Sequence, residues 1–154
     1  MKVEFVNPFI QAAGEVLEAE LGDEAERGGF RMHKTAFTTD EVTALVGVTG
    51  RVSGLVLYSM SEATARGIAA KMMRQPFEVF DEMAQSGIGE LGNVITGRAG
   101  VLLEKGGISA DIAPPMLIVG RGGQLSSLEI PRLVVPLHTS AGEIDLQIAL
   151  RAKQ

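Results

Sequence analysis

The sequence predicts an α+β fold, a single domain over residues 1–154 with helices packed on one face of a mostly antiparallel β-sheet. The length of 154 residues, 45% of them hydrophobic, suffices for one sizeable core. Helical and strand-like segments follow in the order helix, two strands, two helices and several strands. Strands and helices do not alternate one by one, which disfavours a dinucleotide-binding parallel fold.

The first predicted helix starts at Asn7 and Pro8, because Asn caps free amides and Pro fits the first helical turn. Apolar residues at helical spacing predict that it runs over residues 8–21 and ends near Gly22. Residues 22–29 are charged and bounded by glycine, which predicts a loop.

β-branched and apolar residues predict strands in both halves of the chain. In the first half they predict a strand over residues 30–37 and a hairpin of residues 42–48 and 52–60. In the second half they predict four strands, over residues 108–112, 116–119, 133–138 and 144–150.

Two more helices separate these groups of strands. Ser61 is a good N-cap for a helix that reaches about Met73. Pro76 then breaks the pattern, and a longer helix is predicted over residues 78–104, closed by Gly106 and Gly107.

Net charge and cysteine content exclude several function classes. Fourteen Lys and Arg against 19 Asp and Glu give a formal net charge of −5 without a basic patch, so no nucleic-acid partner is expected. Cysteine is absent, which removes thiolate metal sites and cysteine nucleophiles. No apolar run approaches the roughly 20 residues of a membrane-spanning helix, and the N-terminal segment is unlike a signal peptide. We therefore expect a cytoplasmic protein with no membrane partner, and no metal ligands.

The third helix carries the candidate functional residues. At about 100° per residue, one apolar stripe can face the core, formed by Ala84, Ile88, Leu91, Ile95 and Leu102. A polar row falls on nearly the opposite side, formed by Ser86, Glu90, Asn93 and Gly97.

Five glycines lie in this helix, at positions 87, 89, 92, 97 and 100. Each costs about 1 kcal/mol relative to alanine. Missing side chains around an acid and an amide let another backbone or a large ligand come close, which would offset that cost. Exposed helix faces are more often only solvated, so Glu90 and Asn93 alone leave a purely structural interpretation open.

The segment SGIGELGN, residues 86–93, followed by DIAPP, residues 111–115, resembles the CheX, CheC and FliY phosphatases of bacterial chemotaxis. Their motif is Asp or Ser, three residues, Glu, two residues and Asn, with a proline about twenty residues onward. The resemblance extends over nearly the whole chain, through NPFI, VGVTGRVSGLVLYSM and PPMLIVGRG. It implies a CheC-like fold and hydrolysis of the aspartyl phosphate of a CheY-type response regulator.

The resemblance also implies roles for individual residues. Asn93 would orient the attacking water, as the glutamine of GTPases does, and Glu90 would dock to a lysine of the receiver. Five further residues are expected at the substrate-binding surface, with Ser86 at its rim and the two prolines shaping a wall: Ser86, Gly89, Gly97, Pro114 and Pro115. No cofactor of the chain's own is implied, and Mg²⁺ is expected on the partner receiver.

The resemblance also predicts the branch of the family and the binding partners. A CheC-type protein would repeat the Glu and Asn pair on its first helix, whereas here Glu15 is followed by Glu18, so one active site per chain is predicted, as in CheX. The partner would be a phosphorylated CheY-like response regulator, and a homodimer is expected from the resemblance and from an open sheet edge. The alternative is a non-catalytic, dimeric receiver-binding or scaffold module.

Overall fold

The computed structural model describes residues 1–34, 37–126 and 130–153. The helices are α1 (Val3–Leu21), α2 (Glu62–Met73) and α3 (Glu82–Lys105). The strands are β1 (Glu26–Arg27), β2 (Arg31–His33), β3 (Phe37–Thr38), β4 (Val42–Gly50), β5 (Val52–Met60), β6 (Ala110–Ile112), β7 (Met116–Val119), β8 (Gln124–Leu125), β9 (Arg132–Thr139) and β10 (Gly142–Ala152).

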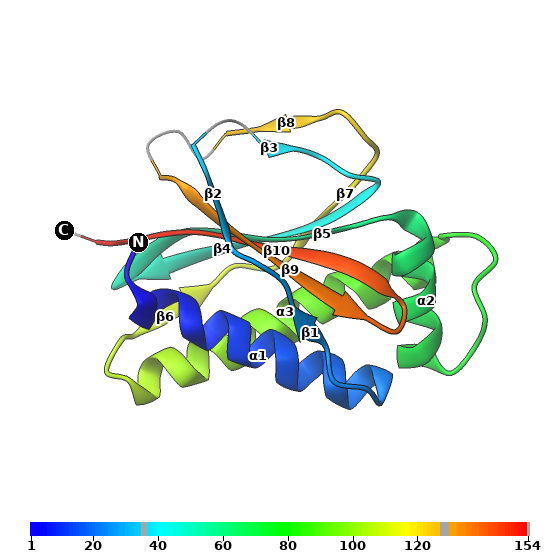
Figure 1. The fold of residues 1–154 in the computed structure, drawn as a ribbon, viewed down its shortest axis with the longest axis horizontal. Coiled ribbons are helices and arrows are strands. Elements are labelled where there is room, and N and C mark those ends of the chain that lie inside the picture. Colours follow the sequence, from blue (N-terminus) through cyan, green and yellow to red (C-terminus); the bar gives the residue numbers. More distant parts are fainter. Residues whose placement is uncertain (35–36, 127–129, 154) are drawn as a thin grey trace.

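The three helices cover one face of an eight-stranded sheet, and the small β3–β8 pair lies on its other side (Figure 1). The strand order is β1-β9-β10-β5-β4-β6, with β2 also paired to β9 and β7 also paired to β4. Every pairing is antiparallel. The predicted fold class is therefore confirmed.

The core lies between the helices and the four long strands, whose alternate residues point toward the helices. From β4 and β5 these are Val42, Ala44, Val46, Val48, Val52, Val56, Tyr58 and Met60. From β9 and β10 they include Val135, Leu137, Ile144, Leu146, Ile148 and Leu150. The hairpin and the last two strands were predicted close to their observed positions, because their alternating apolar residues are a direct consequence of this packing.

Helix α1 starts earlier than predicted. It begins at Val3, with Lys2 as an N-cap that makes no side-chain capping bond, and Pro8 lies inside the helix. The prediction from Asn7 and Pro8 was wrong because the buried Phe5 and Val6 extend the apolar face past the proline. Tertiary packing thus offsets the backbone hydrogen bond that Pro8 cannot donate.

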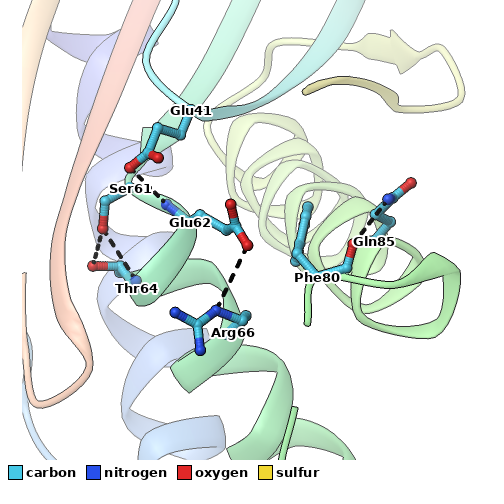
Figure 2. A network of polar contacts seen from close by, with 7 residues as sticks. All are labelled: Glu41, Ser61, Glu62, Thr64, Arg66, Phe80 and Gln85. Carbon is cyan, nitrogen blue, oxygen red and sulfur yellow. Dashed lines mark hydrogen bonds and ion pairs between the residues drawn. The ribbon is translucent and has the colours of Figure 1, made fainter. Parts of the chain in front are cut away.

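The start of α2 agrees with the prediction and is fixed by a polar network (Figure 2). The Ser61 hydroxyl accepts a hydrogen bond from the Thr64 amide at 3.1 Å. A carboxylate oxygen of Glu41 accepts one from the Glu62 amide at 3.3 Å. An i,i+4 ion pair joins Glu62 to Arg66 at 3.8 Å.

Helix α3 begins later than predicted, at Glu82 rather than near residue 78. Asp81 is its N-cap and accepts a hydrogen bond from the Ala84 amide at 2.9 Å. The Gln85 side chain donates to the Phe80 carbonyl at 3.1 Å (Figure 2). Phe80 is buried in the core, so its apolar side chain suits the helical pattern although the backbone there is not helical.

The remaining differences concern short strands. The loop predicted over residues 22–29 contains β1, and β8 was not predicted. The strand predicted over residues 30–37 is divided into β2 and β3, and residues 35 and 36 lie outside the described residues. Strands of two or three residues are too short for an alternation to show in the sequence.

Candidate active site on helix α3

The four residues of the predicted outward row lie on the side of α3 that faces away from the core. Ser86 and Glu90 are exposed, whereas Asn93 and Gly97 are half-buried. On the opposite side, Ala84, Ile88, Leu91 and Ile95 are buried as predicted. Further along the helix Leu102 is only half-buried, and Leu103 is the residue that enters the core.

Among the residues that the structure describes, the side chains of Glu90 and Asn93 have no partner. Within the ranges that the structure describes, neither side chain makes a hydrogen bond or an ion pair with the rest of the protein. The two residues are three apart on one helix, so their side chains are neighbours on its surface. A carboxylate and a carboxamide therefore stand side by side, available to a group outside the chain.

The turn that carries Asn93 is fixed from beneath by Tyr58 of β5. The hydroxyl oxygens of Tyr58 and Thr96 are 2.7 Å apart in the core, and Thr96 donates its single proton to the Gly92 carbonyl, also at 2.7 Å. Tyr58 is thus the donor to Thr96. Burial raises the pKa of the Tyr58 hydroxyl, which keeps that proton in place.

The five glycines of α3 divide into two groups. A Cβ at Gly92 would lie 3.3 Å from the Ala44 Cβ, one at Gly87 would lie 3.0 Å from the Met73 Cε, and one at Gly100 would lie 3.2 Å from the Ile112 Cδ1. These three glycines let α3 pack closely on the sheet and on α2. The idea that they make room for a partner was wrong for them, because their free space is already filled by the protein itself.

Gly89 and Gly97 form the second group. A Cβ at either position would meet no heavy atom within 4 Å. Both are half-buried and lie beside Glu90 and Asn93 on the helix. They leave a low surface around the acid and the amide, and their part in binding a partner stays a prediction.

Pro114 and Pro115 lie in the connection between β6 and β7, which both pair with β4. The connection is held by a hydrogen bond from the Ala113 amide to the Gly47 carbonyl at 2.9 Å. Pro114 is exposed and Pro115 is half-buried. Strands β6 and β7 both contact α3, and the supporting role of the two prolines beside the helix stays a prediction.

Apolar side chains flank the polar row, which the sequence reasoning did not single out. Met83, Val94 and Val101 are 53%, 41% and 51% exposed, although all three belong to α3. Helical spacing could have indicated that these side chains are exposed. Val94, for example, follows Glu90 by one turn and falls outside the core stripe. Large apolar groups exposed around a polar pair are typical of a protein-binding surface.

Helix α1 packs against α3, and where a second pair was considered it carries Glu15 and Glu18 rather than an acid and an amide. Glu15 makes an ion pair with Arg98 of α3, and its other carboxylate oxygen accepts a hydrogen bond from Gln11 at 2.9 Å. The hydrogen bonds from Gln11 and Arg98 lower the pKa of Glu15. The carboxylate that would serve a second site is therefore engaged within the chain.

No helix in the described part of the chain has the length and apolarity needed to cross a membrane. The described residues also contain no group of three or more His, Cys, Asp or Glu that could hold a metal ion.

Comparisons with known proteins agree with the fold and with the family that the sequence resembles. Residues 42–138 match the family described as chemotaxis phosphatase CheX. The chain is 30% identical over 154 residues to the CheY-P phosphatase CheX of Thermotoga maritima, with 99% of both chains covered.

Solved structures share the architecture. A CheC-like superfamily protein from Shewanella sp. PV-4 has a TM-score of 0.89 at 26% identity, covering 99% of this chain and 100% of that one. The CheX–CheY–BeF3–Mg²⁺ complex from Borrelia burgdorferi has a TM-score of 0.82 at 29% identity, covering 97% of this chain and 99% of that one. By its sequence match and its fold, the chain belongs to the CheX family of chemotaxis phosphatases.

Proposed function

We propose that this protein hydrolyses the aspartyl phosphate of a phosphorylated CheY-like response regulator. The observation that carries the proposal is the pair on α3 of an exposed Glu90 and a half-buried Asn93, with no internal partner among the described residues. Both lie within the segment that matches the CheX family. The relative from Thermotoga maritima, 99% of which aligns with this chain, is named a CheY-P phosphatase. The structural relative from Borrelia burgdorferi was solved as a complex with CheY.

Asn93 would act on the water. Phosphoryl transfer depends mainly on positioning and on stabilisation of charge, so the enzyme needs no nucleophile of its own. A carboxamide has both a donor and an acceptor, and it can hold a water in line with the phosphorus. The half-burial of Asn93 and its position on the turn fixed by Tyr58 and Thr96 suit this role.

Glu90 would hold the receiver in register. Its exposed carboxylate can make a salt bridge to a lysine of the receiver, one helical turn from Asn93. A displacement of about 1 Å at the reacting atoms can cost about a hundredfold in rate. Ser86, Gly89 and Gly97 would complete the contact surface, with Pro114 and Pro115 forming its wall.

The partner would supply the metal. We expect Mg²⁺ on the receiver domain, where it would neutralise charge on the phosphoryl group, and no cofactor on this chain. We also propose that the protein acts in the cytoplasm, as a homodimer with one active site per chain.

Phosphate release from a CheY-type receiver phosphorylated with acetyl phosphate tests the proposal. Asn93→Ala should lower kcat by about a hundredfold or more, because the water loses its orienting group. Gln124→Ala is the control, since Gln124 is an exposed carboxamide on β8, on the side of the sheet opposite to α3 (Figure 1). Equal rates for the native chain and Asn93→Ala, with the receiver still bound, would instead support a receiver-binding module without catalysis.

A further inference from the structure

A groove between α1 and α3 lies next to the candidate active site. Its volume is about 350 Å³, and its walls are formed by Glu15, Val16, Ala19, Glu20, Val94 and Arg98. Val94 belongs both to this groove and to the exposed surface of α3, one helical turn after Glu90. The groove is therefore continuous with the surface on which a receiver would dock.

The direction of the helices places Glu20 at the end of the groove nearer to Glu90. Helices α1 and α3 run in opposite directions (Figure 1). The Glu15–Arg98 ion pair fixes their relative position. Glu20 follows Glu15 by five residues, which is about 7.5 Å along α1 and toward the start of α3. That step corresponds to moving back along α3 from Arg98 to the level of Asn93 and Val94.

Among the charged residues that line the groove, one carboxylate has no ion-pair partner in the described part of the chain. Arg98 is paired with Glu15, whereas Glu20 makes no ion pair with any other residue that the structure describes. The other residues that line the groove are apolar and form its apolar strip, namely Val16 and Ala19 of α1 and Val94 of α3. A long side chain with an aliphatic stem and a cationic end matches this arrangement, because its stem covers apolar surface while its charge meets the carboxylate.

We propose that this groove receives a lysine or arginine side chain of the docked receiver, with Glu20 as its counter-ion and Val94 as the contact for its stem. This inference rests on the proposed function and extends it from chemistry to choice of partner. The residues of α1 lie outside the segment 42–138 that matches the family, whereas Glu90 and Asn93 lie inside it. Glu20 is thus a specificity-determining residue, distinct from the pair that acts on the phosphoryl group.

Steady-state kinetics with a CheY-type receiver phosphorylated with acetyl phosphate tests the role of Glu20. Glu20→Gln should raise KM about threefold and Glu20→Lys about tenfold, with kcat unchanged, because only docking is weakened. Added salt should weaken docking less in Glu20→Gln than in the native chain, since one charge pair is missing.

Glu18→Lys is the matched control. Glu18 is an exposed residue on the same helix, its replacement changes the net charge equally, and it does not line the groove. Glu18→Lys should leave KM near the native value. Equal increases of KM in Glu18→Lys and Glu20→Lys would overturn the proposal, because the effect would then come from the overall field of the protein.

A second pair of variants tests the apolar strip without changing charge. Val94→Ala should raise KM about threefold, and Val79→Ala, at a 68% exposed position outside the groove, should not. An unchanged KM for Val94→Ala in a protein with native circular dichroism would also overturn the proposal. The proposed function fails on a different result, namely an unchanged kcat for Asn93→Ala.

Discussion

Glu90 and Asn93 lie three residues apart on α3 but in different surroundings. Glu90 is exposed, whereas Asn93 is half-buried beside Gly92, whose carbonyl is bound by Thr96. An amide that orients a water has to be held in place, while a carboxylate that meets another protein has to reach outward. The difference in burial therefore matches the division of roles that we propose.

Gly97 distinguishes a docking surface from a merely solvated one. Gly97→Leu should raise the free energy of unfolding by about 0.5–1 kcal/mol, because glycine is a poor helix former and the added side chain meets open space. The same change should lower kcat/KM by about tenfold or more, because the side chain stands where the receiver approaches. Urea unfolding and phosphate release measure the two effects.

Gly14→Leu controls for this change. Gly14 is a helical glycine of α1 that also has open space at its Cβ position. The Gly14→Leu variant should have a higher free energy of unfolding than the native chain and an unchanged kcat/KM. If Gly97→Leu were as active as the native chain, Gly97 would not belong to the docking surface.

At the scale of elements, α3 shows what a sequence can predict. The outward row and most of the buried stripe follow from the helical period alone, which suffices to bring Ser86, Glu90, Asn93 and Gly97 together on one side of the helix. The tight packing of Gly92 on Ala44 and Tyr58 could not be predicted in this way, because it joins a helix to two strands far away in the sequence. The groove at Glu20 was missed for the same reason.

The contact between α1 and α3 predicts a pH dependence of stability. The pKa of Glu15 is lowered from its ordinary value of 4.5 by its hydrogen bonds with Gln11 and Arg98. A carboxyl whose pKa is lower in the folded state adds stability above its unfolded-state pKa, and that contribution is lost as the pH falls through the folded-state value. Arg98→Leu should therefore lower the free energy of unfolding at pH 7, and the difference from the native chain should shrink below pH 4.5.

Urea unfolding between pH 7 and pH 3 measures this difference. Arg51→Leu is a suitable control, because Arg51 is exposed and has no ion pair within the described residues. Its difference from the native chain should not depend on pH in this range. A constant difference for Arg98→Leu would mean that the ion pair with Glu15 does not contribute.

At the scale of the whole molecule, the long strands and the order of elements were predictable, and the shortest strands were not. Alternating apolar residues reveal β4, β5, β9 and β10, which each bury one face on the helices. The outer strands β6 and β7 lie within the strands predicted over residues 108–112 and 116–119. The two-residue strand β1 has no such pattern, since it forms only where a long neighbour offers free backbone groups. Similarly, the first turn of α1 depends on burial of Phe5 rather than on a capping residue.

The homodimer is a prediction at this same scale. Light scattering at micromolar concentration should give twice the chain's mass of 16.3 kDa. The edges of the eight-stranded sheet consist of strands of two to four residues, so pairing of two copies there would extend a sheet that is short at its margins. A mass of one chain over this concentration range would contradict the prediction.

The position of β10 has a consequence for how the protein is made. This strand lies between β9 and β5, although it follows both of them in the sequence. A nascent chain still lacking residues 142–152 on the ribosome would hold two long strands without their shared neighbour. Contacts of such long range form slowly, and open strand margins invite association between chains. The β-sheet on which α3 packs is thus completed only once synthesis has passed Ala152.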